Sequence, residues 1–182
     1  MIFKKLPLEG SFLIKPDKKE DKRGFFARTW CSKEFEKKNL DQNLVQINNS
    51  LTIKKGTIRG MHFQYPPKAE TKLVRCINGA VWDVIVDLRK DSTTFGQWYA
   101  VELNKENRTM MYVPKGFAHG FQSLKENSEL IYLHSEFYDI RFEGSVKYND
   151  PDLKINWPLR KKIVSEKDSK NSLLREISPI VL

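Results

Sequence analysis

The sequence predicts an all-β protein, folded as a sandwich or barrel of many short strands. Short apolar-rich segments recur through the middle of the chain, and Pro, Gly, Asn and Asp residues separate them. Such a series, with turn signals at this spacing, is typical of β-sandwiches and β-barrels. Helix-like patterns occur only at the edges of the series. The expected strands are residues 73–77, 80–88, 97–103, 109–113, 120–123 and 129–137.

Asn78 and Gly79 stand between the first two of these strands. An Asn-Gly pair favours a type I′ turn, because both central residues of that turn need a positive φ. We therefore expect residues 73–77 and 80–88 to pair as a hairpin.

The strand at residues 80–88 has two faces of different polarity, because successive side chains of a strand point to opposite sides. One face is purely apolar, with Trp82, Val84, Val86 and Leu88. The other face mixes apolar residues with acids, namely Val81, Asp83, Ile85 and Asp87. Acids on an inward face predict a sandwich or barrel that is lined by a polar cavity.

Two segments favour short helices. Residues 32–39 form the first, with Ser32 as the N-cap. Residues 165–177 form the second, in which Ser165 and Asp168 have the spacing of a capping box.

The composition is that of a globular protein, with 40% hydrophobic and 30% charged residues among 182. This length predicts one domain that spans residues 1–182. No apolar segment approaches the ~20 residues that a membrane helix needs, and we expect no secretory signal. Cys31 and Cys76 lie in no redox or zinc motif, so we expect free thiols and a cytoplasmic protein.

The 32 basic and 23 acidic side chains give a net charge of +9. Such an excess suits a nucleic acid or a small anionic substrate. Much of the charge lies in short runs, such as Lys37-Lys38, without the interleaved aromatic residues of single-strand binders. We expect these runs at the solvent surface, and neither a nucleic acid nor a membrane as partner.

Histidine is scarce, with His62, His119 and His134 as its three occurrences. A mononuclear metal site on a sheet typically takes two histidines that are two positions apart on one strand. Gln64 stands where the second histidine of such a pair is expected after His62. The sequence therefore predicts no metal site, although Asp and Glu could still supply ligands.

The segment from Gly56 to Gln64 places Arg59 near His62, and Lys72 follows on the next strand. Cations bind phosphate and enolate oxygens, and a neutral imidazole can remove a proton near neutral pH. By spacing alone, a surface strand with a packed histidine is the simpler interpretation. Arg59 and His62 also have opposite strand parity, which a bulge at Gly60 could correct.

Further candidates have structural alternatives. Asp83 could orient His119 or His62, but His119 could equally be a hydrogen-bonded structural histidine. Asp168 could orient a catalytic histidine or serve only in the capping box.

Tyr132 could act as a general acid. It is expected to share a strand face with His134, Glu136 and Tyr138. By spacing alone, this face is better explained as aromatic packing inside the sandwich.

Taken together, these segments resemble the dTDP-4-dehydrorhamnose 3,5-epimerase family over nearly the whole chain. Any one segment is a weak match, but their order and separations are highly specific. The segments are residues 21–26, 46–50, 56–64, 72–75, Asp83 with 86–89, 94–98, 114–121, 149–151 and 156–158.

The resemblance implies a double-stranded β-helix, the cupin jelly roll, with short peripheral helices. It also implies a homodimer and a cofactor-free epimerisation of a dTDP-4-keto-6-deoxyhexose at C3 and C5, as in dTDP-rhamnose biosynthesis. The alternatives are an epimerase that inverts C3 alone or acts on another nucleotide sugar, and a non-catalytic cupin that binds a sugar nucleotide.

By the same resemblance, His62 is the base, Asp168 orients it, Tyr132 is the acid and Lys72 lies near the enolate oxygen. Asp83 supports His119. The implied substrate-binding residues are Arg23, Arg28, Gln46, Asn48, Arg59, His119, Tyr138, Glu143 and Lys167. Arg28 and Leu133 depart from the family pattern, because many members carry Glu and Lys at these positions, and His134 has no role that the resemblance implies.

Overall fold

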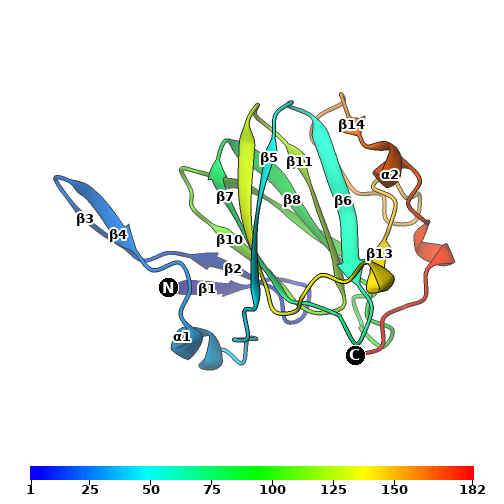
Figure 1. Ribbon diagram of the computed structural model, residues 1–182, viewed down its shortest axis with the longest axis horizontal. Coiled ribbons are helices and arrows are strands. Elements are labelled where there is room, and N and C mark those ends of the chain that lie inside the picture. The colour runs from blue at the N-terminus through cyan, green and yellow to red at the C-terminus, as the bar shows by residue number, and fades with distance from the viewer.

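The computed structural model describes residues 1–182 and confirms the all-β fold. Two sheets of six strands face each other across the molecule (Figure 1). The first, sheet I, has the strand order β1-β2-β10-β7-β12-β5. Its strands are β1 (Ile2–Lys5), β2 (Phe12–Lys15), β10 (Met110–Val113), β7 (Lys72–Asn78), β12 (Ser128–His134) and β5 (Gln46–Thr52).

The second, sheet II, has the order β13-β6-β11-β8-β9, and β14 pairs in parallel with β6. Its strands are β13 (Glu143–Ser145), β6 (Thr57–Gln64), β11 (Phe117–Ser123), β8 (Ala80–Asp87), β9 (Trp98–Asn104) and β14 (Ile163–Val164). The other pairings in both sheets are antiparallel. This arrangement agrees with the expected double-stranded β-helix.

A two-stranded hairpin, β3 (Lys18–Asp21) and β4 (Gly24–Ala27), projects from the body of the molecule (Figure 1). Its tip carries Arg23, whose side chain is 90% exposed. Phe26 on β4 is 77% exposed. The hairpin therefore presents a cation and an aromatic ring to the solvent at a distance from the two large sheets.

The hairpin that we predicted around Asn78 and Gly79 is wrong. β7 pairs with β10 and β12, whereas β8 pairs with β11 and β9, so this turn carries the chain from sheet I to sheet II. Gly79 has a φ of 70°, but Asn78 does not share the positive φ that a type I′ turn needs. A Cβ atom on Gly79 would lie 2.6 Å from the Oγ atom of Ser128, so close packing between the sheets requires glycine.

The first helix is shorter than predicted. α1 spans Ser32–Glu36, and its N-cap is Cys31 rather than Ser32. Asn39, at the expected end of the helix, has a φ of 55°, which is incompatible with a continued right-handed helix.

The second predicted helix begins as expected but is far shorter. Ser165 is the N-cap of α2 (Glu166–Ser169), and its Oγ atom accepts a hydrogen bond from the backbone N–H of Asp168 at 3.0 Å. After α2 the chain packs against the body, where the carbonyl of Ser172 accepts from the N–H of Lys147 at 2.8 Å. Only the short 3-10 helices η1 (Ile140–Phe142) and η2 (Leu174–Glu176) complete the helical content.

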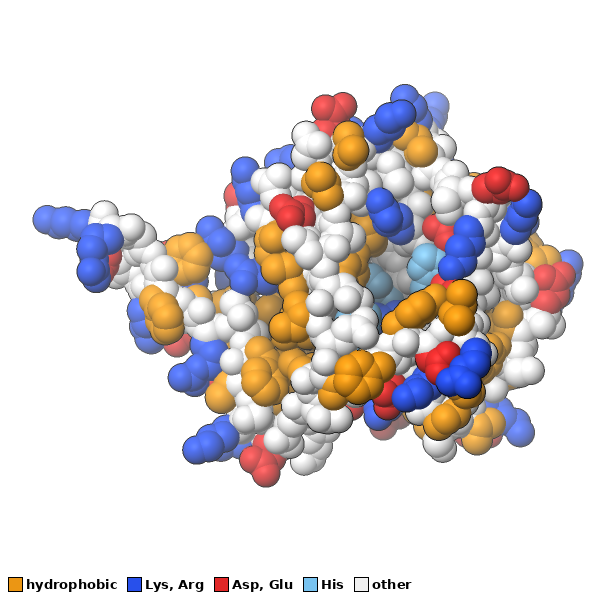
Figure 2. All heavy atoms as spheres, viewed as in Figure 1, with side chains coloured by type: hydrophobic (Ala, Val, Ile, Leu, Met, Phe, Trp, Pro, Cys, Tyr) orange, Lys and Arg blue, Asp and Glu red, His pale blue; other side chains and the backbone are white.

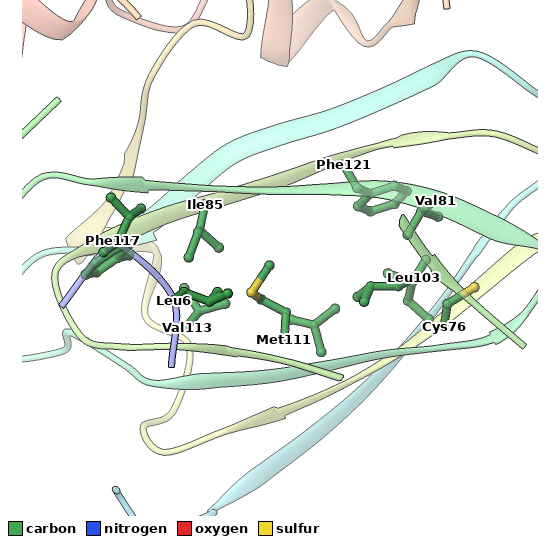
Figure 3. Packing of buried hydrophobic residues seen from close by; sticks show 12 residues of the cluster. Leu6, Cys76, Val81, Ile85, Leu103, Met111, Val113, Phe117 and Phe121 are labelled. Carbon is green, nitrogen blue, oxygen red and sulfur yellow. The ribbon is translucent and has the colours of Figure 1, made fainter. Parts of the chain in front are cut away.

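Twelve buried hydrophobic residues form a core between the two sheets. Figure 3 shows Ile85 and Phe121 of sheet II pointing toward Met111 and Cys76 of sheet I. The predicted faces of β8 are confirmed. Val81 and Ile85 belong to this inner core, whereas Val84, Val86 and Leu88 belong to a second core on the other side of sheet II.

The predicted irregularity at Gly60 is confirmed. His119 of β11 pairs with His62 and Phe121 pairs with Arg59, so β6 uses three residue steps where β11 uses two. Gly60 has a φ of 122°, and a Cβ atom there would lie 2.6 Å from the Cα atom of Gly120. The bulge changes the parity of β6, so that Arg59 and His62 both reach the same cavity.

We predict that Gly60→Ala lowers the free energy of unfolding by more than about 3 kcal/mol, because it combines backbone strain with a clash against the backbone of β11. Urea denaturation followed by circular dichroism measures this effect. Gly24→Ala is the matched control, since Gly24 has a φ of 132° but no atom lies within 4 Å of the position that a Cβ atom would take. It should cost only the strain, about 1–2 kcal/mol. Equal losses in both variants would contradict the prediction.

Candidate active site

A cavity of about 430 Å³ opens between β5 and β12 of sheet I and β6 and β11 of sheet II. Figure 2 shows it as a hollow with histidine side chains inside. Polar and charged groups dominate its lining, as the inward acids of β8 predicted. The lining residues are Asn48, Asn49, Ser50, Arg59, His62, Lys72, His119, Phe121, Tyr132, His134, Ser165, Lys167 and Asp168.

His62 and Asp168 form a hydrogen-bonded pair at the sheet II wall. The Nε2 atom of His62 lies 2.7 Å from Oδ1 of Asp168, although the two residues are 106 positions apart. Because an ionised carboxylate only accepts hydrogen bonds, Nε2 carries the hydrogen and Nδ1 carries the lone pair that a base needs. The His62 side chain is 35% exposed, whereas that of Asp168 is 6% exposed, so the acid supports the histidine from behind.

Only half of the expected capping box forms: Ser165 caps the backbone N–H of Asp168, while the carboxylate of Asp168 orients His62 instead of bonding back to the Ser165 N–H. The same carboxylate also accepts from the backbone N–H of Gly60 at 3.3 Å. Burial tends to raise the pKa of Asp168, but the hydrogen bond and charge of His62 and the bonds from Gly60 and Ser165 bring the pKa below its usual value. The carboxylate is therefore ionised at neutral pH and holds the His62 ring in one tautomer.

Tyr132 lies on β12 in sheet I, which faces the sheet that carries His62. Its hydroxyl is 3.0 Å from the Oγ atom of Ser50. Burial raises the pKa of Tyr132 well above its usual value. The phenol is therefore protonated at neutral pH and can donate a proton or a hydrogen bond into the cavity.

Lys72, at the start of β7, is buried beside His62. Its Nζ atom donates to the carbonyl oxygen of His62 at 3.2 Å and lies 2.9 Å from Oε1 of Glu70. A fixed ammonium group in a partly dehydrated cavity can stabilise a developing oxyanion.

His119 and Asp83 form a second buried pair, with 2.8 Å between Nε2 and Oδ1. Asp83 is fully buried on the inner face of β8, where the strand pattern placed it. The structure therefore joins Asp83 to His119 rather than to His62, and His119 also lines the cavity.

An adjoining cavity of about 170 Å³ brings Gln46, Tyr138 and Glu143 next to His62 and Lys72. At its rim, Lys167 donates to Glu143 at 2.7 Å, and the Tyr138 hydroxyl donates to the same carboxylate at 3.1 Å. These residues join Asn48, Arg59 and His119 among the predicted substrate-binding residues that the fold gathers in one place.

Two predicted binding residues do not line either cavity. Arg23 is at the tip of the β3–β4 hairpin and pairs with Asp21, with 2.6 Å between Nη2 and Oδ2. Arg28 pairs with Glu34 at 2.9 Å and its side chain is 60% exposed.

The structure brings together no group of three or more His, Cys, Asp or Glu side chains that could hold a metal ion. No helix has both the length and the apolar character that crossing a membrane requires.

Comparison with known proteins identifies the family. The family model described as dTDP-4-dehydrorhamnose 3,5-epimerase matches residues 5–176. A protein of that name from Sinorhizobium fredii is 43% identical over 178 residues, which are 97% of this chain and 91% of the relative. The chain belongs to the dTDP-4-dehydrorhamnose 3,5-epimerase family. It is accordingly a sugar-nucleotide isomerase with a cupin jelly-roll fold.

Two crystal structures of the same family have nearly the same fold. The epimerase from Elizabethkingia anophelis has a TM-score of 0.94 and 43% identity, with 97% of each chain covered. The epimerase from Legionella pneumophila, in complex with dTDP-4-keto-L-rhamnose, has a TM-score of 0.93 and 36% identity, with 100% of this chain and 98% of that chain covered.

Three residues of this epimerase site have no role in the sequence-based prediction. His134 lines both cavities, yet the sequence places it only on a strand face. Ser50 contacts Tyr132, although the sequence gives only the segment that contains it. Glu70 pairs with Lys72, and its position two residues before that lysine is the available signal. Glu136 and Tyr138 lie beyond the end of β12, so the predicted shared face stops at His134.

We predict that His134 makes the stability of this epimerase sensitive to mild acid. Burial, the largest cause, acts together with the nearby Lys72 and His119 to lower the pKa of His134 to about 4, and Glu70 partly opposes them. Between pH ~6.5 and pH ~4 the unfolded chain binds a proton at this position and the folded chain does not. The free energy of unfolding therefore decreases as the pH is lowered through this range.

Thermal denaturation of the wild type and of His134→Gln across this pH range tests the prediction. The melting temperature of the wild type should fall more steeply, because the glutamine does not titrate. Parallel falls in the two proteins would show that His134 does not contribute.

Proposed function

We propose that this epimerase inverts C3 and C5 of a dTDP-4-keto-6-deoxyhexose, with His62 as the base and Tyr132 as the acid. The observation that carries the proposal is the placement of these two groups on opposite sheets of one cavity. Inversion requires that a proton leave one face of the sugar and return to the other. A carboxylate-supported imidazole on one wall and a protonated phenol on the other supply these two roles.

The reaction begins at a carbon next to the C4 ketone, which acidifies the hydrogens at C3 and C5. His62 Nδ1 accepts a proton from the carbon, and the electron pair of the C–H bond moves to form an enolate with its charge on the C4 oxygen. The Lys72 ammonium group stabilises that oxygen. Tyr132 then donates a proton to the opposite face of the same carbon, and the ketone re-forms.

The diphosphate and nucleotide need cations and polar groups around the reaction centre. Arg59 and Lys167 lie at the cavity with Asn48, and Gln46, Tyr138 and Glu143 adjoin it. An arginine binds phosphate oxygens in a fork, and amide side chains hydrogen-bond to a base or a sugar. These residues support a sugar nucleotide as substrate.

We also propose that the enzyme acts as a homodimer. Phe26 on the projecting hairpin is 77% exposed, and on the edge strand β5 Ile47 and Leu51 are 68% and 51% exposed. Exposed apolar groups of this size favour a protein partner. Arg23 does not reach the cavity of its own chain, so its predicted contact with the nucleotide requires the cavity of a second copy.

A cytoplasmic location and a role in deoxysugar biosynthesis complete the proposal. Cys31 and Cys76 are both free, as expected in a reducing compartment. The 4-keto substrate must come from an enzyme that oxidises and dehydrates a hexose nucleotide, and the 4-keto product suits a following reductase.

We predict that His62→Asn slows deuterium incorporation at C3 and C5 at least about 100-fold, because it removes the base but keeps a polar group of similar size. NMR of dTDP-4-keto-6-deoxyglucose in deuterium oxide measures the exchange at each carbon, and titration with dTDP checks that the nucleotide still binds. Normal exchange by this variant would exclude His62 as the base.

Tyr132→Phe is the complementary variant. It retains His62, so exchange at C3 and C5 should continue, while the inverted product forms at least about tenfold more slowly. In the wild type, exchange at C3 alone would select a C3 epimerase. No exchange with retained binding would favour a non-catalytic protein.

We predict that Phe26→Asp raises the fraction of monomer, since the new charge would be buried against a second copy. Light scattering with size-exclusion chromatography distinguishes a dimer from the 21.4 kDa monomer. Val181→Asp is the control, because Val181 is 61% exposed near the C-terminus, far along the chain from the hairpin. If the wild type is a monomer in this measurement, the proposal that the enzyme acts as a homodimer is wrong.

A further inference from the structure

We propose that Glu70 is a positioning residue, whose carboxylate directs the ammonium group of Lys72 toward the reacting carbonyl oxygen of the substrate. The inference rests on the function proposed for Lys72. Glu70 lies in the loop between β6 and β7, and its side chain is 5% exposed, against 10% for Lys72. The pair adjoins the base and lines the smaller cavity.

Each oxygen of the Glu70 carboxylate faces a hydrogen-bond donor. Oε1 lies 2.9 Å from Nζ of Lys72, and Oε2 accepts from Nε2 of Gln64 at 3.0 Å. A side chain at position 70 therefore needs two hydrogen-bond acceptors, one toward Lys72 and one toward Gln64.

The orientation of the Gln64 amide follows from its own partners. Its Oε1 atom accepts from the backbone N–H of Asp139 at 2.7 Å, and its Nε2 atom also donates to the carbonyl of Lys68 at 2.8 Å. If the amide were flipped, its NH2 group would face the backbone N–H of Asp139, and two donors would meet. Gln64 thus presents a donor to Glu70, and a glutamine at position 70 would direct its own NH2 donor at one of the two neighbouring donors.

The contacts of Lys72 with Glu70 and His62 leave part of its ammonium group free for a substrate. An ammonium group has three N–H donors. One is directed at the carbonyl oxygen of His62 at 3.2 Å, and the Glu70 carboxylate forms an ion pair with the same ammonium group at 2.9 Å. These two partners occupy at most two of the three donors, and Lys72 lines the main cavity, so at least one donor is free for a substrate oxygen.

The bond to the His62 carbonyl also links the direction of Lys72 to the strand that carries the base. The ammonium group and the imidazole are therefore held relative to each other before substrate binds. Misplacement of a catalytic group by about 1 Å can reduce a rate about 100-fold. Removal of Glu70 should then reduce kcat through Lys72, although Glu70 itself touches no reacting atom.

A double-mutant cycle separates this role from a purely structural one. We expect Glu70→Gln to lower kcat about tenfold with KM changed less than about twofold, and Lys72→Met to lower kcat about 100-fold. In the Lys72→Met background, Glu70→Gln should change kcat less than about twofold. An unchanged kcat in Glu70→Gln, or the same loss in both backgrounds, would overturn the inference.

The matched control is Glu136→Gln. Glu136 pairs with Lys68 at 3.1 Å, and both side chains are about 30% exposed outside the cavities. The same chemical change there should leave kcat as in the wild type. Where Glu70→Gln folds poorly, Glu70→Asp keeps both acceptor oxygens but is one methylene shorter, and we expect a drop in kcat smaller than that of Glu70→Ala.

A second readout does not depend on turnover. Lysine acetylation by acetic anhydride, followed by mass spectrometry of the native protein, reports how accessible and how nucleophilic the Lys72 amine is, and loss of its ion pair should increase both. Its labelling rate should rise at least about threefold in Glu70→Gln and stay unchanged in Glu136→Gln. An unchanged rate in Glu70→Gln overturns the inference even if the wild type epimerises the sugar. Failure of the wild type to epimerise, with the expected rise in labelling, instead overturns the proposed function.

Discussion

The geometry of the site depends on the bulge of β6 at Gly60. The extra residue turns Arg59 and His62 to one side, and the two glycines that meet there let β6 and β11 approach closely. The same residue binds the C-terminal segment, because the N–H of Gly60 donates to Asp168 and its carbonyl accepts from Asn171. One backbone feature therefore places His62 and also holds the segment that carries its carboxylate partner, Asp168.

Burial raises the pKa of an acidic group at each wall of the cavity, but the two groups end in different protonation states. Asp168 loses water but gains hydrogen bonds from His62, Gly60 and Ser165, so it remains charged. Tyr132 loses water and gains only the hydroxyl of Ser50 as a hydrogen-bond partner, so it retains its proton. The difference between a charged acceptor on one side and a neutral donor on the other follows from the number of donors near each group.

The strand pattern and most of the site could be predicted from the sequence, because both depend on local alternation and on motifs with fixed order. The polar face of β8 predicted the position of Asp83, and Gly60 predicted the bulge.

The turn at Asn78 and Gly79 could not be predicted, because contacts with residues distant in the sequence determine which strands pair on either side of a turn. Likewise, the chain after Ser169 follows contacts with the body rather than its own helical preference. The spacing of Glu70 and Lys72 in the sequence is only a weak signal for their pairing, because the contacts that define it come from Gln64 and His62 on another strand.

The register of β7 with β12 explains why a core and a polar cavity can share one sandwich. Along this ladder Leu130 is paired with Cys76, Tyr132 with Val74, and His134 with Lys72. The first pair belongs to the buried core, and the last pair lines the cavity. Tyr132 does both, because it packs against the core and reaches the cavity.

A shift of this register by one residue would turn Tyr132, His134 and Lys72 away from the cavity or out of line with each other. The hydrophobic packing of Leu130 and Cys76 therefore keeps Tyr132 and Lys72 in place, so the stability of the core and the geometry of the cavity depend on the same pairing.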